Sequence, residues 1–436
     1  MWMQAQEPSS IAIRNARVHT VSGSVLAKGT VLVKNGLIEA VGENVAIPAD
    51  AWVIEGEGMN VYPGMIDAMS AIAIDAPITA AGGFGGRGGG SGLPMPPVAA
   101  TQTSAPPARG PEDRPRTFSW ERAADKLRTS DPRIETARSA GFTSAAVFPM
   151  SGIFAGQGAL INLGGENAPR MVVQSPIGQY VSLSRGARGS RGFPSSLMGI
   201  FAYIRQTYID IDFYKQQKSA YEKDPKGKTR PSYDRALEGL IDSPRLMMPA
   251  VSKREMERIL RFADEVRTPM ILYGAHEGFA AADLLKRSGF PVVVSTKWPV
   301  MPADANPDDE PSMEDLTLRD RAPTTPAELA KAQVKFAFTS DGQTPNETLR
   351  AIRQSIARGL APEAALRALT ITPAEMYGVA DRLGSIEKGK IANLVVSKND
   401  LLSERPQIQF VFVDGVKYTP PPPAAPAKPA RGEGNR

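Results

Sequence analysis

The sequence predicts an α/β fold: a (β/α)₈ barrel of the TIM type, joined to a small β-sandwich domain formed by both chain ends. Two observations lead to this prediction. Strand and helix patterns alternate over roughly 250 residues from residue 120 onward, which is typical of a parallel sheet closed into a barrel. Separate groups of strand patterns occupy residues 11–60 and 380–418. The chain has 436 residues, enough for both units.

The strand patterns at the two chain ends each contain a strong hairpin signal. Asn35-Gly36 follows the apolar segment Gly29–Lys34, and Asp414-Gly415 interrupts Ile408–Tyr418. Either group alone would leave an apolar face uncovered. We therefore expect residues 11–60 and 380–418 to build one composite β-sandwich.

Residues 61–379 are assigned to the barrel. The expected strands are Phe142–Phe148, Arg245–Ala250, Pro269–Tyr273, Pro291–Ser295 and Lys335–Thr339, and the expected helices are Trp120–Ala140, Ser196–Lys223, Lys253–Val266, Gly278–Ser288 and Asn346–Gly359. The acidic stretch Pro302–Arg321 is expected to be a loop.

Three segments have compositions that do not predict packed structure. Residues 76–118 are rich in Gly and Pro and include Gly82–Gly90, so we expect a flexible loop over the barrel mouth. A single arginine among these glycines argues against a nucleic-acid partner. Residues 1–10 are expected to be disordered or the start left after signal removal, and residues 419–436 a disordered Pro/Ala-rich tail.

Composition narrows the possible chemistry. The chain has no cysteine, which excludes disulfides and thiolate metal sites. Its two histidines, His19 and His276, are fewer imidazoles than a zinc hydrolase normally uses. No apolar run is long enough to cross a membrane. We expect a periplasmic or otherwise exported protein, with a cytoplasmic one as the alternative.

The segment Val61–Ala71 contains Pro63-Gly64-Met65-Ile66-Asp67-Ala68-Met69-Ser70-Ala71 and is predicted to be a strand on which Asp67, Met69 and Ala71 share a face. It resembles the first barrel strand of the amidohydrolase superfamily, in which histidines stand at the positions of Met69 and Ala71. Further similarity lies in Gly141–Ser144 with Gly156–Ile161, in Thr339–Gly342, and in Leu369–Val396. The resemblance is greatest to the imidazolonepropionase-related and prolidase-like branch.

The resemblance implies a hydrolase of carbon–nitrogen bonds in which divalent metal, commonly zinc, activates water. The ligand positions carried over to this chain are Met69, Ala71, sites near Pro249, Val251 and Gly274, and Asp341. Only Asp341 keeps a ligand-type side chain. We therefore expect a degenerate metal site, no resident metal and no other cofactor.

Asp341 and His276 are the predicted catalytic residues. The resemblance assigns Asp341 the role of general base, which His276 would assist; the alternatives are a turn or helix cap for Asp341 and a structural role for His276. Asp67, Glu277 and Asp341 together are an alternative weak oxygen site for Mg²⁺ or Ca²⁺.

The resemblance and the missing ligand side chains together leave two possible functions. The first is an amidohydrolase of low or no activity on an amide-type, cyclic-amide or non-standard peptide bond. The second is a pseudoenzyme: a ligand-binding or scaffold subunit paired with an intact paralogue. We expect a small amide-type ligand and an oligomeric or paralogous partner, with Gly82–Gly90 and Ser184–Arg191 at the mouth or interface.

Overall fold

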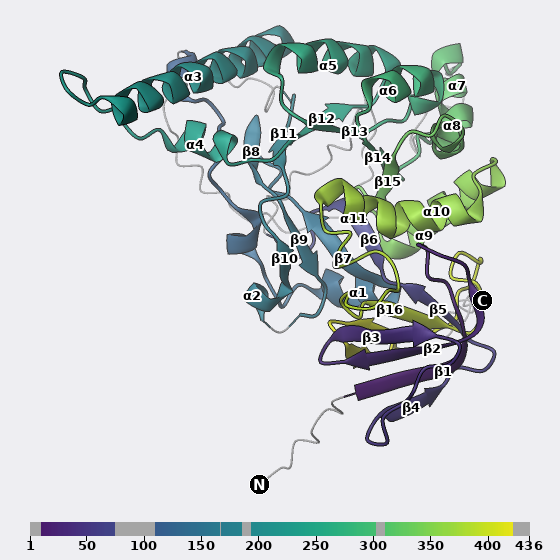
Figure 1. Ribbon diagram of the computed structural model, residues 1–436. Coiled ribbons are helices and arrows are strands. Elements are labelled where there is room, and N and C mark those ends of the chain that lie inside the picture. The colour runs from purple at the N-terminus through teal and green to yellow at the C-terminus, as the bar shows by residue number, and fades with distance from the viewer. Residues whose placement is uncertain (1–9, 75–109, 166, 185–192, 302–309, 422–436) are drawn as a thin grey trace, which may run out of the picture.

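The computed structural model describes residues 10–74, 110–165, 167–184, 193–301 and 310–421, and these form three β-sheets flanked by helices (Figure 1). An eight-stranded sheet lies at one end of the molecule, and helices α3, α5 and α6 lie at the other. In this part of the chain, no helix combines the length and apolar character needed to span a membrane. Most of the predicted unpacked segments 1–10, 76–118 and 419–436, with all of Gly82–Gly90 and most of Ser184–Arg191, lie outside the described residues. Residues 110–118 of the predicted loop are described, and they contain a 3₁₀ turn at Pro111–Asp113 and a buried Thr117.

Both chain ends contribute to the eight-stranded sheet. Its strands are β1 (Ser10–Val18), β2 (Leu26–Lys34), β3 (Leu37–Gly42), β4 (Trp52–Glu55), β5 (Asn60–Pro63), β16 (Leu394–Ser397), β17 (Ile408–Val413) and β18 (Val416–Tyr418). The order is β18-β17-β16-β5-β1-β2-β3, with β4 beside β1. The strands are hydrogen-bonded as one sheet, so the expected sandwich of two sheets is not confirmed.

The two predicted hairpin turns meet within this sheet. Asn35 and Gly36 have φ angles of 51° and 80°, and Asp414 and Gly415 have φ angles of 52° and 76°. These left-handed conformations are those that the two-residue turns between β2 and β3 and between β17 and β18 require. A Cβ on Gly415 would lie 2.6 Å from the Cα of Gly36, so the contact between the turns requires glycine.

Two central sheets carry the alternating part of the chain. One has the order β10-β9-β7-β6, from β6 (Met65–Ser70), β7 (Phe142–Val147), β9 (Ala159–Asn162) and β10 (Val172–Gln174). The other has the order β15-β14-β13-β12-β11-β8, from β8 (Phe154–Gln157), β11 (Gln179–Val181), β12 (Leu246–Ala250), β13 (Met270–Gly274), β14 (Val292–Ser295) and β15 (Phe336–Thr339). β11 to β15 are parallel, as expected, whereas β8 and β9 are antiparallel to their neighbours β11 and β7.

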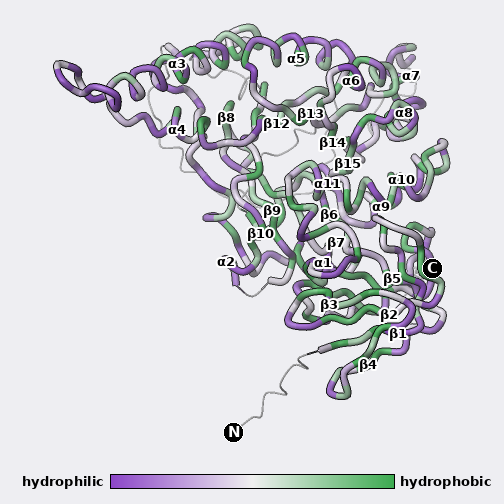
Figure 2. Tube along the Cα trace, in the orientation of Figure 1, coloured by the Kyte–Doolittle hydropathy of each residue, from purple (hydrophilic) through white to green (hydrophobic). Residues whose placement is uncertain are grey.

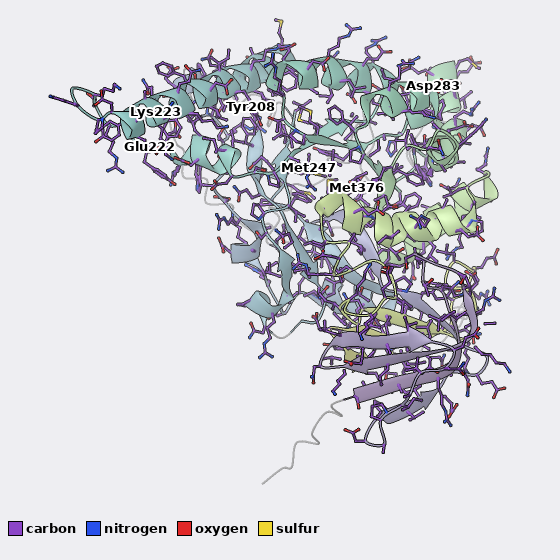
Figure 3. The ribbon with its side chains drawn as sticks, viewed as in Figure 1. Tyr208, Glu222, Lys223, Met247, Asp283 and Met376 are labelled. Atoms are coloured by element: carbon purple, nitrogen blue, oxygen red, sulfur yellow. The ribbon has the colours of Figure 1, made fainter. Side chains whose placement is uncertain are left out.

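Alternate residues of these strands enter two different apolar clusters. The inner cluster takes its strand residues from both sheets: Ile66, Ala68, Met69, Ala146, Phe148, Ala155, Leu160, Tyr180, Met247, Ile271, Tyr273, Val293 and Ala337. Intervening residues such as Leu272, Val294 and Phe338 belong to the outer cluster beneath the helices. Met247 and Met376, labelled in Figure 3, lie where β12 faces α11 (Ile371–Tyr377). This division is the packing of a barrel-like interior surrounded by helices.

β6 and β15 meet through side chains. Ser340 donates to the Asp67 carboxylate from its backbone N–H (3.1 Å) and from its Oγ (2.6 Å). The hydroxyl of Thr339 donates to the backbone carbonyl of Met69. Within the described ranges no β-ladder joins β6 to β15, so a closed eight-stranded barrel is not confirmed, while the α/β arrangement is.

The helices follow the predicted order with two corrections. The remaining helices are α1 (Pro132–Ser139), α2 (Ala168–Met171), α3 (Leu197–Lys223), α4 (Arg235–Ile241), α5 (Lys253–Val266), α6 (Ala282–Ser288), α7 (Met313–Arg321), α8 (Thr325–Lys331), α9 (Pro345–Ala357) and α10 (Pro362–Leu369), with 3₁₀ turns at Pro111–Asp113, Ala123–Lys126, Gly278–Ala280 and Ala322–Thr324. The prediction of a continuous helix over Trp120–Ala140 was wrong before α1, because the Glu121 carbonyl accepts a hydrogen bond from the N–H of Gln157 in β8. The prediction that Pro302–Arg321 is all loop was wrong at α7, which Ser312 caps through the Asp315 N–H.

The strength of the β6–β15 contact can be measured through Asp67, which is buried. Burial raises the pKa of Asp67 to about 6, and the hydrogen bonds from Ser340 and Met69 oppose that rise. A carboxyl pKa raised by folding stabilises the native state at low pH, and this contribution is lost as pH rises from about 4 to about 6. We predict that Asp67→Asn gains stability relative to the wild type across this window, by at most about 3 kcal/mol. Urea unfolding of both proteins between these pH values tests it, and parallel stability curves would contradict it.

Candidate active site

Asp341 lies immediately beyond β15, at the end of the strand where barrel enzymes place their chemistry. Its φ angle is 49°, a left-handed conformation that turns the chain out of the strand. The Ser295 hydroxyl at the end of β14 donates to Asp341 Oδ2 over 2.8 Å, and the Asp341 N–H donates to Thr339 Oγ1 over 3.1 Å. Two neighbouring strand ends therefore hold this carboxylate.

The electrostatic surroundings of Asp341 favour proton exchange near neutrality. Burial raises the pKa of Asp341 to about 6, the Ser295 hydrogen bond and the positive charge of Lys297 oppose the rise, and the negative charge of Asp67 adds to it. Lys297 is exposed, whereas Ser295 is fully buried. The carboxyl group can therefore hold or release a proton close to physiological pH.

Two tyrosines complete the surroundings of this carboxylate. The rings of Tyr180 and Tyr273 are stacked with centroids 5.2 Å apart. Burial raises the pKa of both phenols, and the charge of Asp341 adds to the rise in each, so both remain protonated. The sequence analysis missed Ser295, Tyr180 and Tyr273; the positions of Ser295 and Tyr273 near strand ends are a signal from which they can be found.

His276 lies two residues beyond β13, after Ala275, whose φ angle is 50°. Its side chain is 5% exposed, its Nε2 has no hydrogen-bond partner among the described residues, and its ring lies 6.0 Å from that of Trp298. Burial lowers the pKa of His276 to about 4, which keeps the imidazole neutral. Neither the unpartnered Nε2 of His276 nor the Asp341 bonds to Ser295 and Thr339 form a hydrogen bond between the two predicted catalytic residues.

The prediction that Met69 and Ala71 share a face was wrong. The pairing of β6 with β7 is irregular between Asp67 and Ser70, which breaks strict alternation. As a result Met69 packs in the inner cluster with Ile66 and Ala68, whereas Ala71 packs against the outer cluster. Met69 is 1% exposed and therefore fills interior space.

The positions implied for a divalent metal do not fit one. The thioether, methyl and hydrogen of Met69, Ala71 and Gly274 supply none of the nitrogen or carboxylate donors that zinc uses. Glu277 Oε2 accepts from the Lys253 N–H at 2.8 Å, at the start of α5, and Asp67 is engaged by Ser340. In the described ranges, no three His, Cys, Asp or Glu side chains are grouped so as to hold a metal ion. The alternative oxygen site from Asp67, Glu277 and Asp341 is therefore not formed.

The sequence model of the amidohydrolase family matches residues 253–419. Imidazolonepropionase of Flavobacterium johnsoniae is 36% identical over 96 residues, which span 21% of this chain and 23% of that protein. The match thus covers about a quarter of the curated relative's length.

Solved structures match over nearly the whole chain. An amidohydrolase from Thermotoga maritima has a TM-score of 0.73 and 26% identity, covering 93% of this chain and 99% of the other. A prolidase complexed with N-methylphosphonate-L-proline has a TM-score of 0.55 and 16% identity, covering 94% and 99%, and supports the fold alone. These likenesses imply a TIM-barrel-type fold for the central strands. The family-model match, the imidazolonepropionase relative and the Thermotoga maritima structure together support the amidohydrolase superfamily as the group that this chain resembles.

Proposed function

We propose that this chain is a metal-deficient member of the superfamily with low or no hydrolase activity, and that it binds an amide-type ligand as the partner of a catalytically intact paralogue or of its own copies. The observation that carries the proposal is the loss of donor side chains at Met69, Ala71 and Gly274. A single carboxylate cannot fix a catalytic zinc ion, which needs three protein ligands in an open tetrahedral site.

The ligand class is supported by the groups around Asp341. The carboxylate accepts hydrogen bonds, and the ammonium group of Lys297, whose charge acts on Asp341, donates them. An amide presents both an N–H donor and a carbonyl acceptor, so a small cyclic amide or dipeptide matches this pair. Stacked Tyr180 and Tyr273 add an apolar face next to the polar groups.

A metal-independent hydrolase is the second candidate, and the raised pKa of Asp341 favours it. A carboxylate with a pKa of about 6 is a stronger base than an ordinary aspartate and is still largely ionised at pH 7. In this mechanism Asp341 takes a proton from water as the water oxygen attacks the amide carbon. The protonated Asp341 then gives that proton to the amide nitrogen as the carbon–nitrogen bond breaks, and the amine leaves. His276 has no role in that step, since its ring contacts Trp298 rather than Asp341.

An exported location belongs to the same proposal. The absence of cysteine is compatible with an oxidising compartment. Fractionation of the source cells, with antibodies against the chain, tests the location independently of activity.

Metal content separates this proposal from ordinary superfamily chemistry. We predict that the protein, purified without chelators, carries far less than one equivalent of zinc, manganese or iron per chain, because its donor set is missing. Elemental analysis by mass spectrometry is the measurement. The surface control is Asp283→Asn, whose position on α6 is shown in Figure 3. The proposal of a metal-deficient protein is overturned if one equivalent of metal is tightly held in the wild type and in this control but is lost in Asp341→Asn.

The pH dependence of turnover tests the second candidate. If Asp341 is the base, kcat/KM for an amide panel rises with pH through about 6 as the carboxyl loses its proton. Asp341→Asn then lowers kcat/KM by about 10²–10⁴-fold, the usual contribution of a general base. Asp283→Asn should leave both the rate and the profile unchanged. If none of the three proteins turns over any amide, the metal-independent hydrolase is rejected. The binding role is supported if a ligand raises the unfolding temperature of the wild type and raises that of Asp341→Asn less.

A further inference from the structure

A groove of about 570 Å³ is lined by residues from the first turns of α3 and from the length of α5. These two helices lie at the end of the molecule away from the eight-stranded sheet (Figure 1). Its apolar lining includes Phe201 and Phe262, whose rings meet edge to face with centroids 5.2 Å apart. Leu197 and Met198 extend the lining, and Met198 is 82% exposed. Phe201 and Phe262 are buried and form the floor of the groove, while Met198 and the half-buried Leu197 are its accessible apolar part. Accessible apolar side chains bordered by charge are typical of an interaction site.

The border of the groove is predominantly basic. Arg254, Arg258 and Arg261 recur at i, i+4 and i+7 on α5, so they lie along one face of the helix. In the described ranges none of the three makes an ion pair, whereas Arg205 on α3 is paired with Glu265. Four arginines line the groove against two glutamates, Glu257 and Glu265, which leaves a net positive charge.

α7 of the same chain has the complementary properties. None of its nine residues is buried, so the helix gains little from packing on its own molecule. Met313 is 76% exposed and Leu316 is 43% exposed, and between them lie the exposed carboxylates of Glu314 and Asp315. The start of α7 is therefore an apolar ridge with negative charge.

We propose that the start of α7 in one copy of the chain binds in the α3–α5 groove of another copy. Met313 and Leu316 would cover Met198 and Leu197, while Glu314 and Asp315 would face the unpaired arginines of α5. None of the residues that line the groove belongs to α7, so the two contacting surfaces are different. Such a heterologous contact builds rings or open chains rather than a two-fold dimer. The inference is independent of whether the barrel site is catalytic.

Two variants separate the two surfaces. Arg258→Glu combined with Arg261→Glu reverses the charge of the groove, and Met313→Asp removes the apolar residue of α7 while adding an acid. All three positions are partly or largely exposed, which leaves the core intact. Lys215→Glu combined with Lys223→Glu is the matched control, because it also reverses two positive charges, at exposed positions of α3 outside the groove. Circular dichroism and thermal unfolding establish that each variant is folded.

The mass of the assemblies in solution is measured by size exclusion with light scattering and by sedimentation velocity. The wild type and the control form assemblies larger than one chain, and these weaken between about 0.05 M and 0.5 M salt because charges are screened. Each variant alone is a single chain, with association weakened at least about tenfold. An equimolar mixture of the two variants gives a dimer and nothing larger, because only one intact groove meets one intact α7.

Three results would overturn the proposal. A wild type that stays a single chain at low salt shows that copies of this chain do not occupy the groove. Assemblies that persist unchanged in both variants show that another surface holds the copies together. A mixture that remains single chains while the wild type assembles shows that the two surfaces do not bind each other.

Discussion

The contact between β6 and β15 is the interaction on which the central structure depends. Asp67 accepts hydrogen bonds from the backbone and hydroxyl of Ser340, and Thr339 donates to the carbonyl of Met69. These bonds connect the edge strands of two sheets where no β-ladder does so in the described residues. A buried carboxylate is costly unless its oxygens are satisfied, and Ser340 satisfies both of them. The same contact places Asp341, the next residue, at the rim of the interior.

A second polar network connects the end sheet to the central strands. Asn393 donates from Nδ2 to Ser144 Oγ and to Asn162 Oδ1, and accepts from the Asp414 N–H at 2.8 Å. Asn162 in turn donates to the Asp414 carboxylate at 2.6 Å. The sheet built by the two chain ends is thereby held against β7 and β9. Figure 2 shows hydrophobic colour concentrated on these central strands and hydrophilic colour on the outer turns of α3, in agreement with a core centred on the strands.

Local sequence patterns predicted most strands and the capped helices. Predictions from these patterns failed where contacts with residues distant in the sequence determine the backbone conformation. Lys253–Val266 was predicted with its observed bounds, because apolar periodicity and the Ser252 cap act within the segment. The helix expected from Trp120 failed because the backbone there bonds to a strand far along the chain. The predicted shared face of Met69 and Ala71 was wrong, and the irregular pairing of the strand with β7 near these residues is the physical reason.

The sequence by itself determined the superfamily resemblance, the α/β alternation and the absence of donor side chains at Met69 and Ala71, because these depend on residue type and spacing along the chain. Tertiary structure alone decided that Asp341 lies beside Ser295, Tyr180 and Tyr273 while His276 packs against Trp298. Those neighbours come from different strands, and their approach is set by strand order and by the burial of side chains between elements. The pKa of Asp341 follows from the same burial, which no local pattern encodes.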